Sequence, residues 1–167
     1  MNQYIAHFCQ AATLSVVLAL SAPGAARADG NVAPVPESGI IKVKSVYSKA
    51  ETIARLKQDI AAKGIRFFDE IDQSKLAADA GIQIRPSTLL VFGNPPLCTL
   101  FIRSNALAGL DWPARLLVFE DEQGQVWTAY TDFAYIARRH DVRGMDQDAF
   151  NKATGVIASI TSSVRSR

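Results

Sequence analysis

Cysteine and histidine are scarce in this chain, whose 167 residues include two of each. Cys9 and His7 lie within the first 28 residues, so Cys98 and His140 are the only ones that follow. If that first segment is removed, no disulfide can form within the chain and no Cys/His cluster can hold zinc or copper. The sequence therefore predicts a protein with no metal site and no cofactor.

A charge excess of either sign is also missing. Lys and Arg number 18 against 16 Asp and Glu, for a net charge of +2. Proteins that bind nucleic acid or anionic membranes through their overall charge need a clear basic excess. We therefore expect no nucleic-acid partner.

The N-terminal segment Met1–Ala28 carries a short apolar run, Ala11–Leu20. A membrane-spanning helix needs about 20 apolar residues, so we expect no permanent membrane anchor. Pro23-Gly24 ends the run, and Ala26-Arg27-Ala28 has the small-x-small pattern of a signal-peptidase site. This predicts a signal peptide cleaved after Ala28 and a periplasmic or secreted protein. No Lys or Arg precedes the run, so an N-terminal helix that is retained is the alternative.

The rest of the chain has the length of one domain with a real core. We expect a flexible lead-in at residues 29–39, a single α+β domain at 40–164 and a frayed tail at 165–167. Ser48 and Glu51 form an S-x-x-E capping box, and Gly64 follows the expected helix as a left-handed end residue.

The alternation of apolar and polar residues predicts five strands, with helices after most of them. The expected strands are residues 41–44, 65–71, 88–92, 115–120 and 125–130, and the expected helices follow Ser48, Asp72, Asn94, Thr131 and Asp146. The last two strands form a hairpin around Gly124. This order indicates a two-layer domain, an antiparallel sheet with helices packed on one face.

Cys98 is the first candidate functional residue. It lies near an expected helix start, where a thiol can act as a nucleophile if its pKa is lowered. It could instead form an intermolecular disulfide, or it could be a small buried apolar residue.

Four further candidates lie in loops or at strand starts. Asn94 and Asp111 are loop residues that either bind a ligand or cap the following backbone. Arg85 and Arg115 begin strands, where a guanidinium binds a carboxylate or phosphate or forms a solvated rim.

Tyr130 completes this set. With Phe92, Phe119 and Trp127 it lies on the strands around the hairpin. If the open face of the sheet carries these rings, it offers a pocket for a small polar or acidic ligand, bordered by Arg85 and Asn94. The alternative is that the rings belong to the core.

A basic cluster follows Phe133 at the end of an expected helix, namely Arg138, Arg139, His140 and Arg143. Cations are favoured there by the helix dipole, so this cluster is interpreted as structural.

Three motifs resemble one family. They are Leu89–Pro95, Gly109–Pro113, and Leu116–Asp121 continued by Gly124–Tyr130. In this order they resemble the bacterial domain of unknown function 302, over residues 45–140. The resemblance implies a compact α+β domain similar to the TATA-binding-protein-like β-α-β(4)-α arrangement. It implies no established activity and no catalytic residues.

The chain departs from this family at two positions. Asp72-Gln73 stands where members often have Asp-His, and Cys98 stands where they have a small residue such as glycine. Three function classes follow. The first is an exported module without catalytic activity that binds a small molecule or docks a partner. The others are a homodimeric structural or stress protein, and an enzyme that uses Cys98 and carboxylates.

Overall fold

The structure of this chain is a computed structural model that describes residues 36–144 and 147–165. The expected signal peptide, most of the expected lead-in and the expected cap Asp146 lie outside these residues. In chain order the elements are β1 (Ile40–Lys44), α1 (Lys49–Ala62), β2 (Arg66–Asp72), α2 (Gln73–Asp79), β3 (Ser87–Gly93), α3 (Pro95–Ser104), the 3-10 helix η1 (Ala106–Asp111), β4 (Ala114–Glu120), β5 (Val126–Thr131), α4 (Phe133–Arg139) and α5 (Gln147–Ser162).

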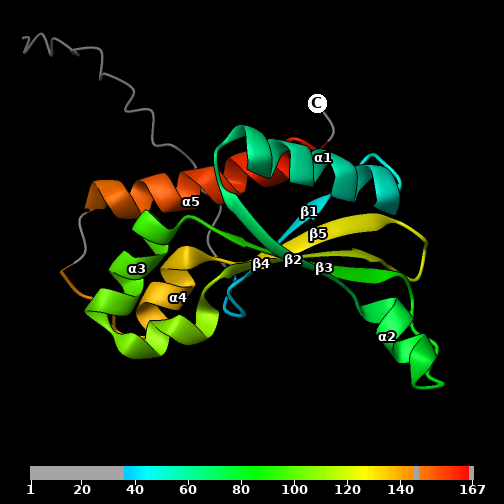
Figure 1. Cartoon of the computed structure of the whole chain (residues 1–167), viewed down its shortest axis with the longest axis horizontal. Helices are drawn as coiled ribbons and strands as arrows, with labels where there is room; N and C mark the ends of the chain where they lie inside the picture. The colour runs from blue at the N-terminus through cyan, green and yellow to red at the C-terminus, as the bar shows by residue number, and fades with distance from the viewer. Residues whose placement is uncertain (1–35, 145–146, 166–167) are drawn as a thin grey trace, which may run out of the picture. The chain divides into compact units, whose positions relative to one another are not determined.

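The strands form a single antiparallel sheet in the order β1-β5-β4-β3-β2. Helices α1 and α5 lie side by side over one face of it (Figure 1). The predicted two-layer α+β fold is confirmed. Sequence reasoning expected residues 109–113 to be a loop, but the 3-10 helix η1 covers the first part of that segment.

Local chemistry explains where helix α1 begins and ends. The hydroxyl of Ser48 accepts the backbone N–H of Glu51 at 3.3 Å, as the capping box predicts. The carboxylate of Glu51 bonds Arg55 at 2.7 Å instead of turning back to the cap, so one half of the box forms. Gly64 then adopts a φ of +65°, which closes the helix.

The core lies between the sheet and helices α1 and α5. Alternate strand residues face these helices and are buried, among them Leu90, Phe92, Leu116 and Val118. Fully burying one such side chain stabilises the fold by about 1.5–3 kcal/mol. The helices contribute the other half of the core: Ile53, Leu56, Ile60, Ala153, Ile157 and Ile160.

The other face of the sheet carries a row of residues that is apolar on four strands and ends in a lysine on β1. The strand register places Ile71, Leu89, Leu117, Ala129 and Lys42 opposite one another, in that order. We call this the open face, and its side chains are partly exposed.

The four aromatic residues around the hairpin are divided between the two faces. Phe119 and Trp127 lie on the open face, with the Lys42 ammonium 4.6 Å from the Trp127 ring. Phe92 and Tyr130 point to the helix-covered face, because they share its strand parity. The prediction that the open face carries all four aromatic rings is therefore wrong.

Both described ends of the domain are held by backbone hydrogen bonds. Asp132 donates its N–H to the Gly39 carbonyl at 2.8 Å, so the last residues of the expected lead-in form an attached turn. Gly39 has a φ of +68°, and a Cβ there would overlap the Tyr135 ring. At the other end Val164 is fully buried and accepts the N–H of Val46.

Candidate functional site

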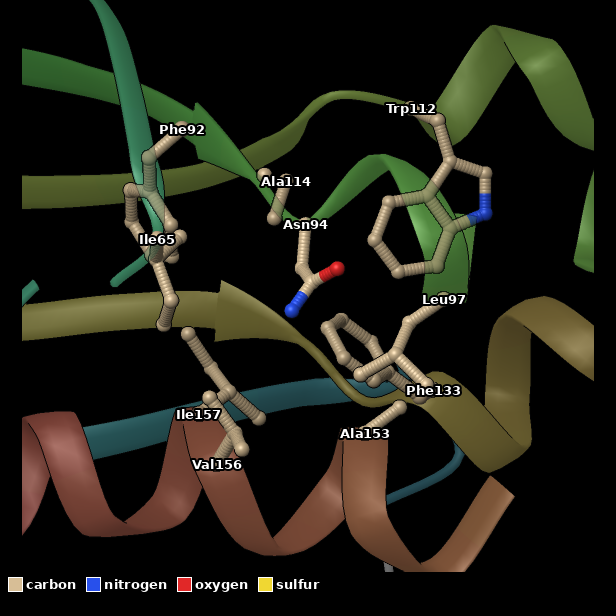
Figure 2. Close-up of a pocket in the computed structure, with 11 residues that line it drawn as sticks. Ile65, Phe92, Asn94, Leu97, Trp112, Ala114, Phe133, Ala153, Val156 and Ile157 are labelled. Atoms are coloured by element: carbon tan, nitrogen blue, oxygen red, sulfur yellow. The ribbon is translucent and has the colours of Figure 1, made fainter. Parts of the chain in front are cut away.

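An apolar pocket with about 30 Å³ of free volume opens on the helix-covered side, between the ends of β3 and β4 and helices α3 and α5 (Figure 2). This free volume holds about one or two water molecules, so a larger ligand binds only when the side chains of the walls move apart. Its walls are almost entirely apolar: Ile65, Phe92, Leu97, Trp112, Ala114, Phe133, Ala153, Val156 and Ile157. The Trp112 indole nitrogen is buried and has no hydrogen-bond partner in residues 36–144 and 147–165, and it points away from Asn94 (Figure 2).

Asn94 provides the polar group of this pocket. Its amide projects among the apolar walls (Figure 2). Asn94 occupies the N-cap position of α3, as predicted, but its side chain makes no capping bond. Pro95 and Pro96 have no N–H, and the N–H of Leu97 donates to the Asn94 backbone carbonyl at 2.9 Å. The interpretation of Asn94 as a side-chain cap is therefore wrong.

The Asn94 amide has no hydrogen-bond partner within the described part of the chain. A capping side chain would stabilise the helix by about 0.5–2 kcal/mol, and this contribution is not made here. An amide can offer two donors and an acceptor, so the side chain is free to bind another molecule.

A second hollow, with about 10 Å³ of free volume, lies next to the first. The two share Ala114, Phe133 and Ile157 as lining residues. Asp111, Arg115, Tyr130 and Thr131 also line the second hollow, together with Ile136. Three of the predicted site residues, Asp111, Arg115 and Tyr130, thus come together here, and Asn94 lies in the neighbouring pocket.

Asp111 is the centre of a charged cluster at this second hollow. Its side chain is 4% exposed, and its Oδ1 accepts a hydrogen bond from Arg115 Nη2 at 3.0 Å. Its Oδ2 lies 2.6 Å from His140 Nε2 and 3.5 Å from Arg139 Nη1. Asp111 therefore does not serve as a backbone cap, since its carboxylate binds three cationic or hydrogen-donating side chains.

His140 and Arg139 are the site residues that sequence reasoning missed. Both were interpreted as helix-end cations, and they do lie at the end of α4, where Arg139 is the last residue and His140 is the C-cap. His140 is also buried, and Asn105 donates to its backbone carbonyl at 2.6 Å, which fixes the end of α4 against η1. Asp111 and His140 are 29 residues apart, and no local pattern signals their contact.

Arg85 does not join the site. It is exposed and precedes β3, whereas Asn94 follows the other end of the same strand. It lines neither hollow. Tyr130 does line the second hollow, where burial and the nearby Asp132 carboxylate raise the pKa of its hydroxyl.

Cys98 lies in the first turns of α3 and is 9% exposed. Burial raises the pKa of its thiol, which is the opposite of what a nucleophile at a helix start needs. Its Sγ packs against Gly93, where a Cβ would come within 3.2 Å. The thiol lines neither of the two hollows.

Cys98 should therefore react slowly with a thiol reagent in the folded protein and rapidly after denaturation. A raised pKa lowers the thiolate fraction at neutral pH, so the native rate should climb as pH increases. Titration with Ellman's reagent, with and without denaturant, measures both rates. Fast native labelling, or a dimer on a gel that reducing agent removes, would support the redox interpretation instead.

Comparison with known proteins identifies the family. The model of DUF302, a domain of unknown function, matches residues 41–160. The chain belongs to the DUF302 family. A solved structure of an uncharacterized conserved DUF302 protein from Bacillus stearothermophilus has the same fold, with a TM-score of 0.68 at 16% identity, covering 76% of this chain and 98% of that one.

Curated relatives of this DUF302 chain are named as fluoride-specific ion channels. The fluoride-specific ion channel FluC 1 of Brucella suis is 36% identical over 122 residues, which are 73% of this chain and 48% of that protein. The FluC 2 protein of Brucella melitensis has the same identity over 45% of its length. The chain thus spans about half the length of the curated relatives it matches. Within residues 36–144 and 147–165, no helix is long and apolar enough to cross a membrane.

Proposed function

We propose that this DUF302 domain binds a small organic molecule in the Asn94 pocket and acts as a binding module without catalytic activity. The observation that carries the proposal is the Asn94 amide, which enters an apolar pocket and has no hydrogen-bond partner among the described residues. Apolar walls with a few directed polar groups are typical of small-ligand sites. A ligand with an apolar ring and one amide or hydroxyl group fits this chemistry.

The two tryptophans allow a direct test. Trp112 lines the pocket, whereas Trp127 lies on the open face with its indole nitrogen donating to Asp121 at 2.7 Å. Trp127→Phe leaves Trp112 as the one tryptophan of the chain, so its emission reports on the pocket. Benzamide, phenol and indole are suitable probes, because each joins an aromatic ring to a polar group. We expect all three or a subset to change the emission in a saturable way.

Asn94→Leu in this background separates binding from scaffolding. Leucine keeps the branched shape of asparagine but its side chain forms no hydrogen bond, so benzamide affinity should fall about three- to tenfold. The melting temperature should stay the same or rise, because an unpaired amide no longer faces apolar walls. Gln123→Ala at the exposed hairpin tip is the control and should change neither value. If no probe changes the Trp112 emission and Asn94→Leu melts several degrees lower, Asn94 is part of the scaffold.

Export is the second part of the proposal. The apolar run Ala11–Leu20 and the Ala26-Arg27-Ala28 site support cleavage after Ala28 and a periplasmic or secreted location. N-terminal sequencing of the protein from that compartment should begin at Asp29. Mature protein that retains Met1 would contradict this location.

Docking to a partner is the second candidate function, and the curated relatives favour it. A helical channel needs spans of about 20 apolar residues, and the described residues of this chain contain no such helix. We infer that the matched half of those relatives lies outside the membrane, joined to the channel part. The open face supplies a surface for such contact.

This candidate is tested by co-expressing the chain with the half of a Brucella relative that it does not match. Leu117→Lys places a charge at the centre of the open face and should abolish co-purification. Leu107→Lys, at an exposed position on η1, is the control. Equal recovery of both variants would exclude the open face as the docking surface.

A further inference from the structure

The charges around Asp111 do not balance. One carboxylate is met by two guanidinium groups, Arg115 and Arg139, which stay protonated at any physiological pH. His140 Nε2 lies 2.6 Å from the same carboxylate and must carry its hydrogen, because a carboxylate can only accept. A single arginine would be enough to compensate one buried carboxylate. The cluster therefore keeps at least one positive charge in excess.

The two guanidinium groups also keep donors available. Arg115 uses Nη2 for both of its contacts, to Asp111 and to the Leu110 carbonyl, and Arg139 uses Nη1. Their side chains are 49% and 53% exposed. Each group therefore turns one edge inward to Asp111 and leaves its other N–H groups toward solvent. A guanidinium held in this way offers a fork that matches a carboxylate or phosphate.

The second hollow adds polar groups beside this fork. Arg115, Tyr130 and Thr131 are among its lining residues. Asp111 is nine-tenths buried and fixes both guanidinium groups through its carboxylate. The arginines therefore need little reorganisation to bind an anion.

We propose that Arg115 and Arg139 form an anion site that binds the carboxylate or phosphate group of a small ligand, with Asp111 as the residue that positions them. This assigns to Asp111 an internal role, although sequence reasoning placed it in contact with the ligand. Arg139, which that reasoning assigned to the helix dipole, becomes a binding residue.

This inference extends the proposed function. Only one part of it rests on that function, namely that a single ligand occupies both hollows. Ala114, Phe133 and Ile157 line both of them. An acidic group at the arginines and an apolar ring near Asn94 can therefore belong to one molecule, an aromatic or aliphatic acid. The anion site itself is independent of the Asn94 pocket.

The test uses inorganic phosphate and acetate as probes, with the arginine Nε–Hε signals in NMR spectra of nitrogen-15-labelled protein as readout. We expect saturable shifts of the Arg115 and Arg139 signals, stronger for whichever anion the site prefers. Arg139→Gln should weaken binding roughly tenfold or more, because it removes a charge-assisted bond. Arg139 is half exposed and its contact is 3.5 Å long, so this variant should fold normally.

Two further variants complete the test. Arg115→Lys keeps the charge but removes the fork, and it should also weaken binding. Arg143→Gln is the matched control, since Arg143 is 83% exposed and pairs with Asp141 instead. If Arg139→Gln and Arg143→Gln weaken binding equally while Arg115→Lys leaves it unchanged, the binding is a general charge effect, and the absence of saturable shifts would equally overturn the anion site.

Benzamide and benzoate, added to the Trp127→Phe protein, separate this inference from the proposed function. We expect benzoate to bind more tightly than benzamide and to lose that advantage in Arg139→Gln. If benzamide binds and benzoate is no tighter, the anion site fails as part of the ligand site while the Asn94 pocket stands. If phosphate shifts the arginine signals and neither aromatic probe affects Trp112, the pocket fails and the anion site stands.

Discussion

Replacing Asp111 with alanine is expected to lower the free energy of unfolding by about 3 kcal/mol. Removing one partner of a buried charge cluster typically costs about 3–5 kcal/mol. We expect a cost at the lower end of this range because Arg115 and Arg139 are half exposed, so water can solvate them. His140 is 7% exposed and would stay unpaired. Urea denaturation followed by circular dichroism measures the change.

Two comparisons make the Asp111 prediction specific. Asp111→Asn keeps the shape and one hydrogen bond, so its cost should be clearly smaller. A double-mutant cycle with His140→Ala should give a coupling energy within the range of about 0.5–3 kcal/mol known for residues in contact. A cost below about 1 kcal/mol for Asp111→Ala, without coupling to His140, would show that this carboxylate does not hold the cluster together.

Phe101→Ala is expected to cost about 3–5 kcal/mol, the range for truncating a buried phenylalanine. Phe101 is fully buried, and its ring lies 4.9 Å from that of Trp112 and 6.2 Å from that of Phe133. Alanine would leave a cavity behind the walls of the Asn94 pocket, so the emission of Trp112 should also change. Urea denaturation and fluorescence of the same samples give both values.

Phe68→Ala is the matched control, because it is the same substitution at a side chain that is 44% exposed. We expect it to cost about 1 kcal/mol or less, as exposed positions usually do. Similar costs for both variants would mean that the aromatic cluster around Phe101 does not form the core beneath the site.

Much of the fold was predictable, because its signals are local. Ser48 caps α1 and Asp72 caps α2, where each accepts a hydrogen bond from an N–H three residues on. Gly124 has a φ of +72° in the hairpin that its position indicated. Each of these features depends on a few neighbouring residues, so the sequence suffices to find it.

The candidate site was predictable only in part. Asn94, Asp111, Arg115 and Tyr130 were identified as candidates, and the structure places them in two adjoining hollows. Their roles were not predictable. The two prolines after Asn94 remove the donors it would have capped, and the sheet parity places Phe92 on the covered face rather than the open one. The prediction that Arg85 borders the site with Asn94 is wrong, because the two residues lie at opposite ends of β3.

The order of the strands and α-helices, the caps of α1 and α2 and the family follow from the sequence, since periodicity, turn residues and motifs are read along the chain. Tertiary structure alone decided that Asp111 meets His140 and Arg139, and that Asn94 turns its amide into a pocket walled by α5. The physical reason is that these contacts join residues that are 28 or more positions apart in the chain. Burial of the shared core brings them together, and no local pattern encodes the distance between them.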